Sequence, residues 1–178
     1  MQKSEPELLN VVDVEATCWA GSPPPGQVGE IIEIGLAVVD LAAGERIARH
    51  RIVVRPARSA VSAFCTELTG ITQAEADGGA DFAEACRILA AEHRAGALPW
   101  ASWGDYDRRR FARQCAATGA PYPFGRRHTN AKALFAEVHG LRRRPGMARA
   151  LGIAGLPWRG GTTGARTTRG TSRPWCSR

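Results

Sequence analysis

The most constraining feature of the chain is an apolar stretch that ends in two acidic residues. Residues 8–17 read LLNVVDVEAT, so Asp13 and Glu15 are two positions apart. Successive side chains of a strand point to opposite faces of a sheet, which places Asp13 and Glu15 on one face about 7 Å apart. Val12 and Val14 then anchor the other face. The sequence therefore predicts a sheet with two carboxylates at one strand end.

Two carboxylates at this distance repel each other unless a proton or a cation lies between them. A hard cation that prefers oxygen ligands, such as Mg²⁺, is the usual solution in proteins. Asp-x-Glu triplets also occur by chance at strand ends, and the triplet alone favours that ordinary explanation over a metal site. The rest of the sequence must decide between the two.

The composition is that of one domain of ordinary soluble protein. The chain has 178 residues, of which 44% are hydrophobic and 23% charged, enough for one full core. No stretch approaches the roughly 20 apolar residues of a membrane span, and the first residues have no signal-peptide character. Five cysteines without a Cys-x-x-Cys pair indicate neither a disulfide framework nor a zinc site. We expect a cytoplasmic protein with reduced, mostly buried thiols and no membrane contact.

The net charge of +7 is unevenly distributed. Five of the 24 basic residues lie in 159–178, which has no acid, so the remaining body has 19 basic and 17 acidic residues. Basic runs at 108–110, 126–128 and 142–144 are more typical of solvated faces than of a phosphate-binding track. Close to a carboxylate site, however, such runs would suit a polyanionic substrate.

Apolar periodicity and capping signals predict an α/β fold, with a mixed sheet flanked by helices. Strands are expected at 8–17, 30–40, 51–54 and 98–103, with the first three in an antiparallel meander. Helices are expected at 62–68 before Gly70, from 82 after Asp81 as N-cap, at 107–118, after Asn130 and from Pro145.

The second of these strands carries an internal acid, Glu33. Alternation puts Ile32 and Ile34 on one face of the strand and Glu33 with Ile31 on the other. On that second face Glu33 is either exposed to solvent or supports the acids of the first strand. The pattern favours neither alternative.

A third acid, Asp107, follows the strand at 98–103 and falls in the first turn of the next helix. The helix dipole alone would account for an isolated acid at this position. Four segments nevertheless occur in the order typical of one family. They read VVDVEATCW (11–19), EIIEIG (30–35), FCTELTGIT (64–72) and WGDYD (103–107).

With these segments, which fall within residues 8–158, the chain resembles the DEDDh class of 3′ to 5′ exonucleases. The resemblance is to its histone-mRNA 3′ exonuclease-like and KapD-like branch. It implies a ribonuclease-H-like fold with a mixed five-stranded sheet flanked by helices. The substrate implied is the single-stranded 3′ end of RNA or DNA.

The resemblance also implies residue roles. Asp13, Glu15 and Asp107 become catalytic metal ligands, and the backbone at Ala16 and Thr17 meets the terminal nucleotide. Two divalent ions, Mg²⁺ or Mn²⁺, roughly 4 Å apart would hold the scissile phosphate.

The chain departs from the family at the third motif, which supplies a general-base His and a fourth Asp just after a phrase like GLPW (155–158). Residues 159–171 contain neither a His nor an acid. When the codons of these residues are read in a shifted frame, the new codons can encode His, Gly, Asp, Asp, Ala and Asn at the positions where the family has them. A frameshift between Trp158 and Thr162 is therefore our hypothesis for this departure.

Two regions follow from this interpretation: an exonuclease domain over 1–158 and a disordered Arg/Gly/Thr-rich tail over 159–178, without the family's closing helix. Catalysis should be impaired, because loss of a general base typically costs about 10²- to 10⁴-fold in rate. One alternative is a non-catalytic nucleic-acid-binding module whose Arg-rich tail contacts phosphates. Another, which ranks last, is a generic α/β core whose acids are helix caps and solvated residues.

Overall fold

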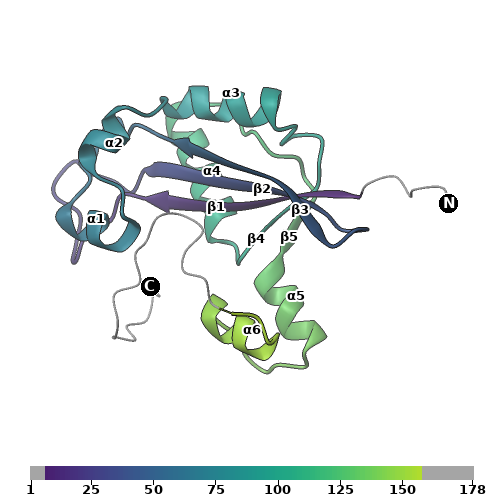
Figure 1. Ribbon diagram of the computed structural model, residues 1–178. Coiled ribbons are helices and arrows are strands. Elements are labelled where there is room, and N and C mark those ends of the chain that lie inside the picture. The colour runs from purple at the N-terminus through teal and green to yellow at the C-terminus, as the bar shows by residue number, and fades with distance from the viewer. Residues whose placement is uncertain (1–6, 158–178) are drawn as a thin grey trace.

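A five-stranded mixed sheet forms the centre of the protein (Figure 1). The computed structural model describes residues 7–157. The strand order is β3-β2-β1-β4-β5. β2 pairs antiparallel with β1 and β3, while β4 pairs parallel with β1 and β5. The strands are β1 (Leu8–Ala16), β2 (Ile31–Asp40), β3 (Glu45–Val53), β4 (Trp100–Ser102) and β5 (His128–Asn130). The predicted fold class is confirmed, including the antiparallel meander of the first three strands.

Six helices surround the sheet within the described residues. They are α1 (Ala63–Thr69), α2 (Gln73–Asp77), α3 (Phe82–Glu92), α4 (Tyr106–Thr118), α5 (Ala131–Val138) and α6 (Met147–Ile153). α1 and α2 lie near the end of β1, and α5 and α6 lie beyond the short strands β4 and β5 (Figure 1). No helix within residues 7–157 is long and apolar enough to cross a membrane.

The helix boundaries follow the capping signals of the sequence. The Ser62 side chain accepts a hydrogen bond from the Cys65 amide at the start of α1, and Gly70 ends that helix with φ 81°. Asp81 caps α3 and Asn130 caps α5 in the same way. These side chains satisfy backbone amides that have no partner inside the helix.

The main core lies between one face of the sheet and helices α3 and α4. Val12 and Val14 of β1 pack there with Leu89 of α3 and Phe111 of α4. Asp13 and Glu15 alternate with the two valines and therefore lie on the opposite face. This alternation confirms the predicted orientation of β1 and leaves the acids outside the main core.

A smaller core lies beneath α1 and α2 and corrects one prediction. Ile32 packs in this cluster with Val61 and Cys65, whereas Ile31 and Ile34 belong to the main core. The prediction that Ile32 shares a face with Ile34 is therefore wrong. The register between β1 and β2 shifts after Glu15, and this irregularity changes the side-chain alternation at the start of β2.

Several boundaries also differ from those predicted. β3 begins at Glu45 rather than Arg51, because an edge strand can pair through its backbone while carrying charged side chains. α2 and β5 were not predicted, since both are too short to show a hydrophobic period. α6 begins at Met147 after Gly146, not at Pro145. The expectations of a disordered tail over 159–178 and of a missing closing helix concern a part of the chain outside the described residues.

Candidate functional site

The site is built on the end of β1, where Asp13 and Glu15 share one face of the sheet. Glu15 is the cross-strand partner of Glu33 on β2, so their side chains lie side by side. Directly opposed like charges are unfavourable unless a positive charge or a proton compensates them. This strand end therefore concentrates negative charge.

Asp107 joins these acids from a distant part of the sequence. It lies in the first turn of α4 and is only 4% exposed. Its Oδ1 accepts a 3.0 Å hydrogen bond from the amide of Val14, the residue between Asp13 and Glu15. The structure thus brings together the three acids that the sequence singled out.

The electrostatics of the site reflect this crowding. Burial and, next, the charge of Asp13 raise the pKa of Glu15 to about 8, with Glu33 and Asp107 acting in the same direction. Burial and the charge of Asp13 also raise the pKa of Asp107 to about 7, although the hydrogen bond from Val14 opposes the shift. No cation from residues 7–157 is among the groups that shift either pKa, so negative charge and burial dominate at both carboxyls.

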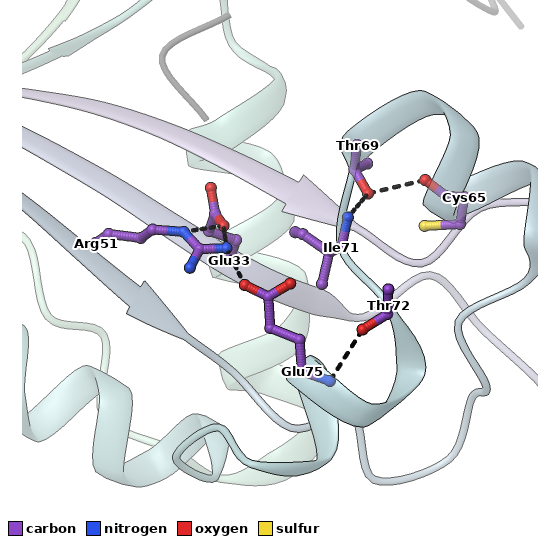
Figure 2. A network of polar contacts seen from close by, with 7 residues as sticks. All are labelled: Glu33, Arg51, Cys65, Thr69, Ile71, Thr72 and Glu75. Carbon is purple, nitrogen blue, oxygen red and sulfur yellow. Dashed lines mark hydrogen bonds and ion pairs between the residues drawn. The ribbon is translucent and has the colours of Figure 1, made fainter. Parts of the chain in front are cut away.

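Glu33 is fully buried, so the solvent-exposed alternative for this residue is wrong. Its Oε2 pairs with the guanidinium of Arg51 on β3, which also binds Glu75 Oε1 at 2.6 Å (Figure 2). The other oxygen, Oε1, is buried and has no hydrogen-bond partner. Arg51 thus compensates only part of the negative charge beside Glu15.

The segment after Glu15 is held firmly in place. Ala16 and Thr17 are buried, and the Thr17 amide donates to Glu30 O at 2.8 Å. The Thr17 hydroxyl accepts from the Glu30 amide at 2.9 Å and donates to Val28 O at 3.1 Å. The Thr17 amide is therefore already engaged, and any ligand here must use other groups of this segment.

Asp105 differs from Asp107 despite its proximity. Its Oδ2 accepts a 2.9 Å hydrogen bond from Asn130 Nδ2, and its Oδ1 lies 3.6 Å from Arg108. Asp105 therefore ties the start of α4 to the start of α5. Asp107, and not Asp105, is thus the acid that bonds to β1.

The donor chemistry of the three acids fits a hard divalent cation. Within residues 7–157, no three His, Cys, Asp or Glu side chains are grouped so that all of them could hold one ion. Mg²⁺, however, is usually held by one or two carboxylates together with waters and substrate phosphates. Pairs drawn from Asp13, Glu15 and Asp107 meet that requirement. Burial and the negative charge of Asp13, which raise the pKa of Glu15 and of Asp107, are effects that a bound cation would offset.

Sequence reasoning missed two residues near the site, Arg51 and Glu75. Arg51 is the charged first residue of the strand expected at 51–54, Glu75 lies in a segment without apolar periodicity, and neither belongs to a motif. The only signal that could have found them is the internal acid Glu33, because a buried carboxylate requires a cationic partner.

A mixed sheet of this order with acids at the end of β1 and the start of α4 defines a ribonuclease-H-like architecture of the exonuclease type. The RNase_T family, described as Exonuclease, matches residues 11–151. The chain belongs to this family.

Relatives of known function match part of the chain. The 3′-5′ exonuclease Snipper of Drosophila melanogaster is 44% identical over 70 residues, which are 38% of this chain and 25% of that protein. ERI1 exoribonuclease 2 of Danio rerio is 41% identical over 71 residues, 39% of this chain and 12% of that protein. The chain thus spans a quarter or less of the length of these relatives.

Solved structures agree in fold at low identity. The nuclease domain of 3′hExo, a DEDDh family member bound to rAMP, superposes with a TM-score of 0.75 at 24% identity, covering 90% of this chain and 84% of that domain. A 3′-exonuclease that recognises the 3′ end of the histone mRNA stem-loop gives a TM-score of 0.71 at 24% identity, over 89% of this chain and 74% of that one. These similarities confirm the ribonuclease-H-like fold.

Proposed function

We propose that this chain is a metal-dependent 3′ to 5′ exonuclease domain that removes nucleotides from the single-stranded 3′ end of RNA or DNA. The observation that carries the proposal is the hydrogen bond from Val14 to Asp107 Oδ1, which holds the third acid against the pair on β1. Membership of the exonuclease family supports it.

In this proposal Asp13, Glu15 and Asp107 hold two divalent ions, Mg²⁺ or Mn²⁺. Such ions lower the pKa of a bound water and stabilise the leaving oxygen of a phosphodiester. The chain itself orients the acids: β1 fixes Asp13 and Glu15, and the Val14 amide fixes Asp107. Glu33 is held in place by Arg51 and lies beside Glu15 on the neighbouring strand, so it acts on the ion site through Glu15.

The segment Ala16–Thr17 is proposed to meet the terminal nucleotide. Its support is rigidity: Thr17 is tied to Glu30 and Val28, so the backbone beside the acids is already ordered. Ordered contacts lose little conformational entropy when a ligand binds. The two structural neighbours described with rAMP and with a histone mRNA stem-loop make an RNA 3′ end a reasonable first substrate.

We further propose that catalysis is impaired in this exact chain, because residues 159–171 supply neither the general-base His nor the fourth Asp. A cytoplasmic location is proposed as well, since none of the four described cysteines forms a disulfide.

The test uses 5′-labelled single-stranded RNA and DNA, incubated with Mg²⁺, Mn²⁺ or a chelator. This chain is compared with a version in which the shifted frame after Trp158 is restored. The restored chain should give a ladder of shortened products only with metal, about 10² to 10⁴ times faster than this chain.

An Asp13→Asn variant of the restored chain should lose that ladder, whereas Asp105→Asn should keep it because Asp105 bonds to Asn130. Retarded but unshortened substrate from the restored chain, with or without metal, would instead establish a binding module and refute the nuclease proposal.

A further inference from the structure

Two cysteines from distant parts of the chain meet beside the candidate site. Cys18 follows the Ala16–Thr17 segment, and Cys65 lies in α1. The Cys18 side chain is hydrogen-bonded to the Cys65 thiol. Cys18 also packs against the small core cluster that contains Cys65 and Ile71. Neither residue forms a disulfide in this structure.

The backbone on both sides fixes this contact. The Ser62 hydroxyl donates a 2.6 Å hydrogen bond to Cys18 O and accepts a 3.0 Å bond from the Cys65 amide. The Cys65 thiol also donates to Ala16 O at 3.5 Å. Figure 2 shows Cys65 on α1, with its backbone carbonyl bonded to Thr69. Ser62 therefore joins the two backbone segments that carry the sulfur atoms.

The two thiols differ in access and in charge. Cys18 is half-buried, and Cys65 is fully buried. The hydrogen bond from Cys18 lowers the pKa of Cys65 to about 6, against the effect of burial. Near neutral pH the pair accordingly shares a single thiol proton. A half-buried thiol, Cys18, therefore lies beside a cysteine with a lowered pKa, Cys65, and oxidisable cysteines have such a neighbour and such access.

We propose that Cys18 and Cys65 are a reversible oxidation site that hydrogen peroxide converts into a disulfide. The proton that the pair shares first passes from Cys18 to Cys65 through the hydrogen bond between them. Cys18, which solvent reaches, then attacks the peroxide oxygen as thiolate. This step forms the Cys18 sulfenic acid and breaks the O–O bond, and the released hydroxide takes a solvent proton. Cys65 sulfur then attacks Cys18 sulfur, and hydroxide leaves with the Cys65 proton as water.

In the balance one thiol and one thiolate lose two electrons and form the S–S bond, while one hydrogen peroxide and one solvent proton, with the thiol proton, become two waters. The final S–S bond is about 2.05 Å long, so the hydrogen-bonded sulfurs need only a local approach. The new bond would fasten the end of the Ala16–Cys18 segment to α1. The proposal concerns this chemistry alone and does not rest on the nuclease assignment.

The chain contains a matched internal control. Cys86 of α3 and Cys115 of α4 are also hydrogen-bonded to each other, but both are buried in the main core. Because peroxide in solvent cannot reach these two sulfur atoms, we expect the second pair to stay reduced although its cysteines are close to each other. A comparison of the two pairs therefore separates solvent-accessible chemistry from mere closeness of sulfur atoms.

The experiment treats the reduced full chain with hydrogen peroxide, alkylates the remaining thiols after denaturation and maps the peptides by mass spectrometry without reductant. We expect loss of two of the four described thiols, a joined peptide through Cys18 and Cys65, and its disappearance after dithiothreitol. Cys18→Ser and Cys65→Ser should abolish the joined peptide. Cys86→Ser should keep it.

Three outcomes would overturn the proposal. The first is Cys18 oxidised to sulfinic acid with no joined peptide. The second is Cys86 joined to Cys115 as readily as Cys18 to Cys65. The third is Cys18 joined instead to Cys176. Circular dichroism of each variant before treatment verifies that the folded protein is compared.

Discussion

The amide of Val14 and the Oδ1 of Asp107 are joined by a 3.0 Å hydrogen bond, although 93 positions of sequence separate the two residues. The bond connects the middle of the acidic pair on β1 to the first turn of α4. Because Val14 also packs in the main core, the position of Asp107 is tied to that core. The proposed metal ligand Asp107 and the packing of the core are therefore linked at one peptide group.

Replacement of Asp107 should separate the charge of the site from its structure. Asp107→Asn keeps a side-chain oxygen that can accept from Val14 but removes one negative charge. We expect a folded protein whose Mn²⁺ affinity falls by more than the about 10- to 100-fold typical of residues that only support a ligand. Isothermal titration calorimetry measures this change.

Asp105→Asn is the matched control for that titration, since Asp105 bonds to Asn130 rather than to β1. Equal Mn²⁺ affinities for the wild-type chain and Asp107→Asn would contradict the role given to Asp107.

The metal-free protein should become less stable as the pH rises from about 4.5 to about 8. The pKa of Glu15 is raised from 4.5 to about 8 in the folded state, so the folded chain holds a proton that the unfolded chain has already released. Stability from this group is complete below about 4.5 and is lost as the pH rises through about 8. Asp107, with its pKa raised to about 7, adds to the same trend.

Chemical denaturation in the presence of a chelator, repeated across this pH range, tests the trend. Glu15→Gln should flatten the profile because its side chain cannot ionise. A stability that rises with pH, or a Glu15→Gln profile as steep as that of the wild type, would show that the folded protein does not hold this proton.

Arg51 should stabilise the protein mainly by compensating Glu33. Arg51→Met leaves a buried carboxylate without its cation, and we expect a loss of about 1 to 3 kcal/mol in unfolding free energy. The double variant Arg51→Met/Glu33→Gln should recover part of that loss, because the orphaned charge is gone. Urea denaturation gives both values.

Glu75→Gln is the control, because it changes the exposed carboxylate that also pairs with Arg51. It should cost only about 0 to 1 kcal/mol, as do other exposed ion pairs. A loss from Glu75→Gln as large as that from Arg51→Met would mean that α2, not Glu33, depends on the guanidinium.

Two adjacent glycines after α2 should respond oppositely to the same substitution. A Cβ on Gly79 would lie 2.7 Å from the carbonyl oxygen of Val53, whereas the nearest atom to one on Gly78 would be Glu75 O at 3.5 Å. Gly79→Ala should therefore cost about 1 to 3 kcal/mol. Gly78→Ala should be neutral or stabilise by up to about 1 kcal/mol. Thermal unfolding of the two variants under identical conditions tests this difference. Equal melting temperatures would refute the close approach of Gly79 to the Val53 carbonyl.

Much of the site was predictable from local pattern. Alternation placed Asp13 and Glu15 on one face, and a strand-to-helix transition placed Asp107 at the start of α4. Their convergence required the family resemblance, because no local rule relates residues so far apart in the chain. Arg51 was not predictable, since its partner Glu33 becomes buried only when the sheet forms.

The errors in the fold have related causes. Ile32 was assigned to the wrong face because alternation assumes regular pairing, and the register shift after Glu15 appears only in the assembled sheet. The charged part of β3 was missed because backbone pairing at an edge needs no apolar pattern. Short elements such as β5 obtain their structure from neighbours rather than from their own sequence.

The hydrogen bonds between Thr17 and Glu30 close the neck of the surface loop that carries Pro23 to Pro25. Glu30 is itself anchored by the amides of Ala57 and Arg58. Because the neck is fastened independently of the loop tip, engineers can lengthen the tip or graft a fluorophore there without displacing the carboxylates. The loop tip is therefore an attachment point that tolerates insertion and lies close in sequence to the proposed catalytic acids.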